Sequence, residues 1–179
     1  MHHTLIALVE DKPGVLNRIS SLFRRRNFNI DSLTVGRCET AEHSRMTIVV
    51  DTRRTRADLV AANLRKLVPV VDVQDVTHLP TVERDLALIR VRCEDAARPE
   101  LSELAALFRA RVVDVAPGSL MLEVTGSEEK VEALLDLLRP RGILEMARTG
   151  KVAMVRGVAV NGNGHGNGNH GDTEARSNG

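Results

Sequence analysis

The apolar positions of residues 4–78 follow strand and helix periodicities in turn. Residues 5–9 form a short apolar run, which predicts a buried strand. Apolar residues then recur at helical spacing from Val15 to Phe23, which predicts a helix ending near Arg26. The elements expected after it are strands at 28–35, 46–50 and 70–76, and a helix carried by Leu59, Val60, Leu64 and Leu67. The predicted order is βαββαβ.

The same order recurs in residues 84–157, although sequence identity between the two segments is weak. The expected elements are strands at 86–91, 112–115, 120–124 and 143–147, with helices at 101–108 and 127–138. Pro117-Gly118 is a strong turn signal between the two middle strands. Residues 152–155 form one more apolar stretch, which would pair with the last strand or with a partner chain. Residues 79–84 are the predicted linker.

The fold class predicted from this pattern is α+β, with two tandem ferredoxin-like βαββαβ units at 4–78 and 84–157. Each unit is expected to be a four-stranded antiparallel sheet with two helices on one face. Residues 158–179 are rich in Gly, Asn and His and have little to bury, so a disordered tail is expected. His165 and His170 in this tail support only a weak metal-binding interpretation.

Four local signals add detail to this plan. Asp11 is a good N-cap for the first helix, with Pro13 in its first turn. Thr55 is the predicted cap of the second helix, and Ser127 opens the last helix. A break in alternation at Asp31-Ser32 predicts a β-bulge in the second strand.

Composition excludes several function classes. Hydrophobic residues make up 42% but aromatic residues only 2%, so the core must be aliphatic and stacking platforms for single-stranded nucleic acid are lacking. Lys plus Arg is 25 and Asp plus Glu is 24, so charge gives no long-range attraction to nucleic acid or membrane. The three arginines at 24–26 form the one strong basic cluster. They suit a solvated helix end or a docking patch for an acidic partner.

The two cysteines and the hydropathy of the chain indicate in which cellular compartment the protein is expected. Cys38 and Cys93 lie far apart and outside any CxxC pattern, so reduced, buried thiols are expected. No amino-terminal apolar stretch has the length of a secretory signal, and no run approaches the ~20 apolar residues of a membrane span. We therefore expect a soluble, cytoplasmic protein.

No catalytic motif emerges from the chain. The GxSxG, HExxH and P-loop patterns are absent. The histidines outside the tail have no partner at suggestive spacing, and Cys38 lacks a candidate base nearby; these histidines are His2, His3, His43 and His78. The sequence therefore predicts a non-catalytic protein with no metal site and no cofactor of its own.

The most informative stretch is EDKPGVL at 10–16. A strand here leads to a helix N-terminus, whose unpaired amides form a ready anion site. Gly14 lets a ligand approach the backbone closely, and Asp11 places a carboxylate beside that positive end. Together these groups suit a zwitterion such as an amino acid. The alternative is that Asp11 only caps the helix and that Pro-Gly is a local turn.

Several blocks resemble the small subunit of acetolactate synthase, in the order expected for that family. They are LVEDKPGVL at 8–16, LFRRRNFNIDSLTV at 22–35 and SRMTIVV at 44–50. VERDLALI at 82–89 resembles the start of the family's second domain, and VDV at 113–115 resembles its middle. The first block alone indicates an ACT domain, whereas the ordered set over residues 1–157 is more specific.

The resemblance implies an ACT domain that pairs edge to edge with its twin in a homodimer and binds valine at the interface. Such pairing would also cover the apolar second strand if it lies at the sheet edge. By motif position, polar contacts to valine would come from Asp11 and Asn29, and backbone and apolar contacts from Gly14, Val15, Leu16 and Ile30. Many family members carry Asn at the position of Asp11. An acid there would hold an ammonium more firmly but would repel a carboxylate.

The resemblance also implies a non-catalytic regulatory subunit. Its partner would be the large catalytic subunit of acetolactate synthase, a transferase of branched-chain amino-acid biosynthesis that carries thiamine diphosphate, Mg²⁺ and FAD. The small subunit would activate the large one and confer feedback inhibition by valine or another branched-chain amino acid. The alternative is a free-standing ACT-domain sensor that regulates another enzyme. An RNA-binding module of similar topology would need an aromatic strand that this chain lacks.

Overall fold

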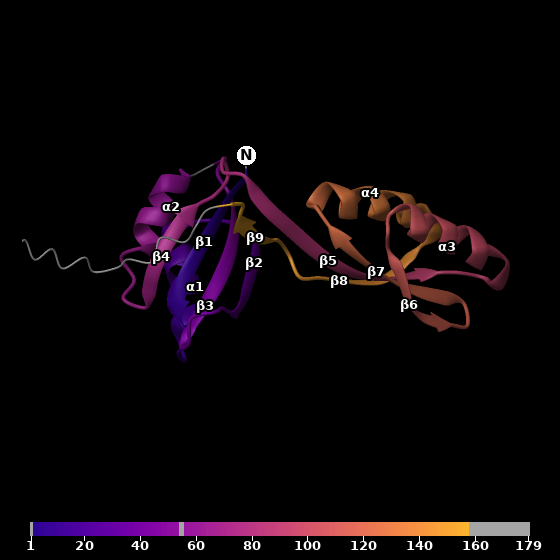
Figure 1. Ribbon diagram of the computed structural model, residues 1–179, viewed down its shortest axis with the longest axis horizontal. Helices are drawn as coiled ribbons and strands as arrows, with labels where there is room; N and C mark the ends of the chain where they lie inside the picture. Colours follow the sequence, from indigo (N-terminus) through magenta and orange to yellow (C-terminus); the bar gives the residue numbers. More distant parts are fainter. Residues whose placement is uncertain (1, 54–55, 158–179) are drawn as a thin grey trace, which may run out of the picture.

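The computed structural model describes residues 2–53 and 56–157, which form two units connected by one long strand (Figure 1). The elements of the first unit are β1 (His2–Glu10), α1 (Val15–Arg26), β2 (Ile30–Arg37), β3 (His43–Asp51), α2 (Ala57–Leu64) and β4 (Val70–Asp75). The predicted tail at 158–179, with His165 and His170, lies outside the described residues, as does the predicted cap Thr55.

The second unit repeats the plan with short 3-10 helices added. Its elements are β5 (Thr81–Arg92), η1 (Asp95–Ala97), α3 (Arg98–Leu107), β6 (Arg111–Ala116), β7 (Ser119–Gly126), α4 (Glu128–Leu138), η2 (Arg139–Arg141), β8 (Ile143–Arg148) and β9 (Val152–Val155). Figure 1 shows α3 and α4 on the same side of their sheet.

The two sheets have equivalent strand orders, β2-β3-β1-β4 and β6-β7-β5-β8, and every paired strand is antiparallel. In each unit the first and third strands are central, and the second and fourth lie at the edges. This is the ferredoxin-like plan, so the predicted fold class is confirmed.

Local signals explain where the helices begin and end. Ser127 caps α4 by accepting a hydrogen bond from the Lys130 amide at 3.4 Å, so the prediction that the last helix opens at Ser127 is confirmed. The first helix ends at Arg26, as predicted, and Asn27 closes it in a left-handed conformation. Its start differs from expectation, because Gly14, with φ of 86°, precedes the first helical residue. Asp11 makes no capping bond, so the N-cap prediction for Asp11 is wrong.

The predicted irregularity in β2 is also present. The pairing of β2 with β3 shifts register between Ile30 and Ser32. One extra residue at this point lets the apolar side chains on either side stay on the core face. Ile30 and Leu33 accordingly both pack against the first core.

The connection between the units is strand rather than loop. Most of the predicted linker 79–84 belongs to β5, which begins at Thr81 and continues into the second sheet. The apolar stretch 152–155 forms β9, which pairs with this early part of β5 and not with the last strand. Neither expected partner of 152–155 is therefore correct, because the segment that pairs with it lies in the predicted linker.

Two largely aliphatic cores lie between the helices and the sheets, and Phe23 and Phe28 add aromatic rings to the first. The first includes Leu5, Ile19, Ile48, Leu64 and Val73, and the second includes Ile89, Leu101, Leu122, Leu134 and Leu138. Cys93 is buried in the second core, as expected, whereas Cys38 is only partly buried. Within residues 2–53 and 56–157, no helix combines the length and hydropathy needed to cross a membrane.

The second core gives a direct stability test on one helix. Leu134 of α4 is fully buried, whereas Leu137 of the same helix is 49% exposed. We expect Leu134→Ala to lower the free energy of unfolding by about 2–5 kcal/mol, because it removes buried methyl groups and leaves a cavity. Leu137→Ala should change it by less than about 1 kcal/mol. Urea denaturation at one protein concentration compares the two, and equal losses would contradict the packing described.

Candidate functional site

The first group of predicted site residues lies after the carboxyl end of β1. Gly14 has the left-handed conformation that favours glycine, and a Cβ added there would meet no atom within 4 Å. The Asp11 carboxylate is half exposed, and its Oδ2 lies 3.9 Å from Nε of Arg37 at the end of β2. The Asp11 backbone N–H donates to the Glu42 carbonyl at 2.7 Å. The Asp11 carboxylate is therefore exposed and takes no part in capping α1.

The first turn of α1 leaves donors available to a ligand. Arg18 N–H already donates to the Gly14 carbonyl at 3.0 Å. Within the described residues, no acceptor is paired with the amides of Leu16 and Asn17. The Leu16 side chain is 49% exposed, while Val15 is buried in the first core. A ligand here would meet free amides and the Leu16 side chain, and Val15 could contribute only its backbone.

The second group lies at the amino end of β2. Asn29 Nδ2 donates to Oδ1 of Asp31 at 2.9 Å, and the Asn29 carbonyl accepts from the Asp51 amide at 3.3 Å. Asn29 is exposed, whereas Ile30 is partly buried against the first core. The Asn29 side chain is thus positioned by Asp31 with its amide oxygen unpaired among the described residues.

These two groups lie at opposite ends of the sheet within one chain. Glu10, just before the first group, pairs with His43 at one end of β3, whereas Ile30 pairs with Val50 at the other. At about 3.3 Å per residue, the strand from His43 to Val50 spans roughly 23 Å. No single valine-sized molecule can therefore touch both groups of the same chain.

The strand that connects the two groups is an edge strand. β2 pairs with β3 on one side and with no other described strand. None of its residues is fully buried, and the apolar Val35 is 46% exposed. An edge of this kind presents unpaired peptide groups that favour pairing with another strand.

Among the described residues, the histidines and Cys38 do not assemble a reactive site. Nδ1 of His3 lies 2.9 Å from Oδ2 of Asp75. Burial alone would raise the pKa of Asp75, but hydrogen bonds from Thr77 and His3 outweigh it and lower that pKa. The Cys38 thiol faces backbone carbonyls, 3.5 Å from that of His43. Across residues 2–53 and 56–157, no three His, Cys, Asp or Glu side chains are grouped to hold a metal ion.

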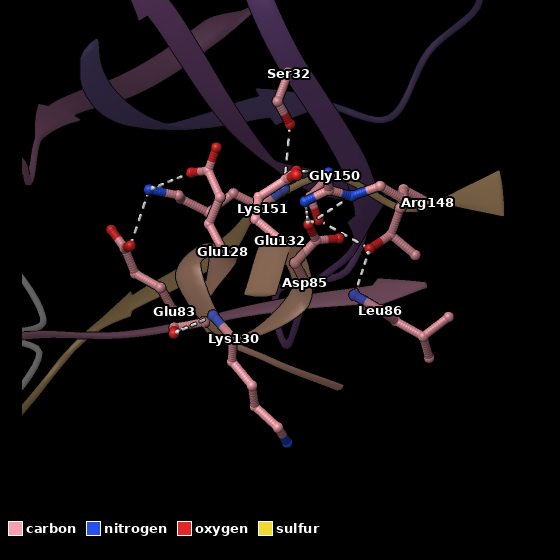
Figure 2. Close-up of polar contacts among 12 residues, drawn as sticks. Ser32, Glu83, Asp85, Leu86, Glu128, Lys130, Glu132, Arg148, Gly150 and Lys151 are labelled. Atoms are coloured by element: carbon pink, nitrogen blue, oxygen red, sulfur yellow. Dashed lines mark hydrogen bonds and ion pairs between the residues drawn. The ribbon is translucent and has the colours of Figure 1, made fainter. Parts of the chain in front are cut away.

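The two units are joined by a set of contacts that the sequence does not predict. We call it the joint: Ser32, Thr34 and Thr47 of the first sheet against residues 149–153. Ser32 Oγ accepts from the Lys151 amide at 3.1 Å (Figure 2). Thr34 Oγ1 donates to the Thr149 carbonyl at 3.2 Å, and Thr47 Oγ1 accepts from the Ala153 amide at 3.4 Å. These partners are 106 to 119 positions apart, so no local sequence signal could have found them.

Ion pairs fix the second-unit side of the joint. Arg148 bonds to Asp85 of β5 and Glu132 of α4 (Figure 2). Burial would lower the pKa of Arg148, but its bonds to these two carboxylates outweigh burial and raise it. Nζ of Lys151 lies 2.9 Å from Oε2 of Glu83 and 3.7 Å from Oε2 of Glu128. The 148–151 segment is thereby held to both β5 and α4.

A cavity of about 360 Å³ lies beside the joint, between the units. Its walls include Asp31 and Ser32 from β2 and Asp85, Arg148 and Gly150 from the second unit. None of the six predicted site residues lines this cavity, although Asp31 is the hydrogen-bond partner of Asn29.

Known proteins match both units. The family described as the AHAS small subunit-like ACT domain matches residues 5–72, and the family described as the small subunit of acetolactate synthase matches residues 84–157. The chain belongs to the acetolactate synthase small-subunit family. The resemblance seen in the residue blocks is thus confirmed.

The match between this chain and its relatives extends over nearly the whole length of each relative. The probable acetolactate synthase small subunit of Archaeoglobus fulgidus is 54% identical over 157 residues, which cover 88% of this chain and 98% of the relative. The Mycolicibacterium smegmatis acetolactate synthase small subunit is 50% identical over 155 residues, covering 87% and 91%. The crystal structure of the Thermotoga maritima small subunit superposes with a TM-score of 0.81 at 40% identity, covering 89% of this chain and 99% of that one.

The left-handed backbone conformation of Gly14 gives a second test of stability. We expect Gly14→Ala to lower the free energy of unfolding by about 1–2 kcal/mol, because a Cβ is disfavoured at this φ. Gly14→Asn should lose less, since Asn tolerates the left-handed region better than Ala. Chemical denaturation of the three chains is the measurement, and an alanine variant as stable as the parent would contradict the conformation assigned to Gly14.

Proposed function

We propose that this chain is the regulatory subunit of acetolactate synthase, which activates the catalytic large subunit and makes it sensitive to valine. Family membership supports a large-subunit partner, since the relatives are named small subunits. One observation carries the proposal for valine: two groups suited to an amino acid lie at opposite ends of an unpaired edge strand.

A homodimer would bring the two groups together. If β2 pairs antiparallel with β2 of a second copy around a two-fold axis, the Ile30 end of one copy lies beside the Arg37 end of the other. Asp11 lies close to Arg37, so Asp11 and Gly14 of one copy would then face Asn29 and Ile30 of the other. The dimer would carry two equivalent sites, each incomplete without the partner copy.

The groups so assembled match the chemistry of valine. Its carboxylate would accept from the free amides of Leu16 and Asn17, where the helix end also favours negative charge. Its ammonium would lie near the exposed carboxylate of Asp11 and the amide oxygen of Asn29. Its isopropyl group would contact Leu16 of one copy and Ile30 of the other. Another branched-chain amino acid would make the same polar contacts.

The chemistry itself would belong to the large subunit, with its thiamine diphosphate, Mg²⁺ and FAD. For this chain to regulate it, valine must bind more tightly to the small-subunit arrangement that supports the less active enzyme. A coupling free energy of about 1–3 kcal/mol is enough for a useful response.

Valine binding is tested by thermal stability of the purified chain. We expect valine to raise the melting temperature, since a ligand at 100 times its dissociation constant adds about 2.7 kcal/mol. Gly14→Trp should abolish the rise, because the open space at this position would be filled by the indole. Gly118→Trp is the matched control and should keep the rise: Gly118 also has positive φ and open space, but lies in the second unit. A parent chain that shows no valine-dependent shift would contradict valine sensing.

The edge pairing is tested by the oligomeric state. Val35 of β2 is 46% exposed, and Val71 on the opposite edge strand β4 is 56% exposed. We expect the parent chain to be a dimer and Val35→Asp to weaken it, because two like charges would meet near the two-fold axis. Val71→Asp should remain dimeric. Sedimentation equilibrium measures both variants. Dissociation caused by Val71→Asp alone would place the interface at β4 and contradict pairing through β2.

A further inference from the structure

We infer that the contact of Ser32 with the Gly150–Lys151 turn couples the proposed valine site to the second unit. This inference rests on the proposed function, and it concerns how valine binding in the first unit would affect the second unit. The starting observation is that β2 serves two purposes within a few residues. Asn29 and Ile30 belong to the proposed site, while Ser32 hydrogen-bonds the second unit.

The bulge of β2 lies between these two positions. The register shift separates Ile30 from Ser32, so this is the point where β2 departs from regular pairing with β3. Asp31, the extra residue, accepts from Nδ2 of Asn29 and faces the ring of His2, with 3.3 Å between Oδ2 and Nδ1. A ligand that reorients the Asn29 amide therefore acts directly on the residue at the bulge.

On the second-unit side, the turn that contacts Ser32 is held in place by several interactions. Ser32 Oγ accepts from the Lys151 amide, and the neighbouring Gly150 has φ of 80°. A Cβ at Gly150 would clash with Ser32 Oγ, so the Ser32 side chain lies directly against the Gly150 backbone, where only glycine leaves room for it. The ion pairs of Arg148 and Lys151 hold this turn to β5 and α4, so a displacement of the turn would be carried to the second unit (Figure 2).

The adjoining surface gives this contact room to change. The cavity between the units is bordered by Asp31 and Ser32 on one side and Arg148 and Gly150 on the other. Close packing usually resists small shifts, whereas a cavity next to a hydrogen-bonded contact lets the two walls move relative to each other. Ile6, Val76 and Ala153 form a small apolar cluster on the same interface, which would act as the fixed part.

The test compares valine binding with valine inhibition in the complex of this chain with the large subunit. We expect Ser32→Ala to raise the valine concentration for half-inhibition about fivefold or more, with valine affinity of the free chain within about twofold of the parent. Activation of the large subunit without valine should be unchanged. Ser102→Ala is the matched control, because Ser102 is exposed on α3 far from the joint, and it should behave as the parent chain.

A second variant tests the contact itself. Gly150→Ala should also reduce inhibition, because the added Cβ pushes Ser32 away. In the double variant with Ser32→Ala the clash with Oγ is gone and the strain of a Cβ at positive φ remains, so the loss of inhibition should be smaller than the sum of the two single effects.

A half-inhibitory valine concentration for Ser32→Ala within about twofold of the parent value would overturn the inference, as would additive effects in the double variant. Equal loss of valine binding and inhibition would also overturn it, because Ser32 would then belong to the binding site. If the parent chain itself neither binds valine nor responds to it, the proposed function fails first. The parent and variant measurements thus separate the two failures.

Discussion

The unpaired edge of β2 is the constraint on which the account depends. The ferredoxin-like strand order leaves β2 with one neighbour, and its exposed edge includes an apolar valine. The same order places Asp11 and Gly14 at one end of the sheet and Asn29 and Ile30 at the other, since β1 and β2 both run from the Ile30 end toward the Asp11 end. A site made of both groups must therefore span two copies of the chain. Edge pairing and ligand binding are, on this view, two consequences of one strand position.

Features governed by neighbouring residues could be predicted from the sequence. The end of α1 near Arg26, the bulge at Asp31-Ser32 and the Ser127 cap all follow from short-range patterns. The Asp11 cap failed because the positive φ of Gly14 delays the start of α1 to Val15. The pairing of β9 with β5 and the joint could not be predicted, since they unite residues about 70 to 119 positions apart. The six site residues remain a prediction, and the separation of their two groups became visible only in three dimensions.

The two units differ in what they can contribute. The first offers free helix amides, an exposed carboxylate and the open edge. The second offers a rigid frame in which Arg148 and Lys151 tie the turn at Gly150 to β5 and α4. Because β5 begins at Thr81 and pairs at once with β9, most of the connection between the units is strand rather than loop. Such a connection suits a protein that must convert ligand binding in one unit into a change felt by a partner at another surface.

The most direct test of the central claim is the activity of the purified large subunit with thiamine diphosphate, Mg²⁺ and FAD, measured alone, with this chain, and with this chain plus valine. The account predicts that the chain raises acetolactate formation and that valine lowers it again only when the chain is present. If the chain leaves the rate unchanged and valine has no effect on the mixture, the regulatory role proposed for this chain is contradicted.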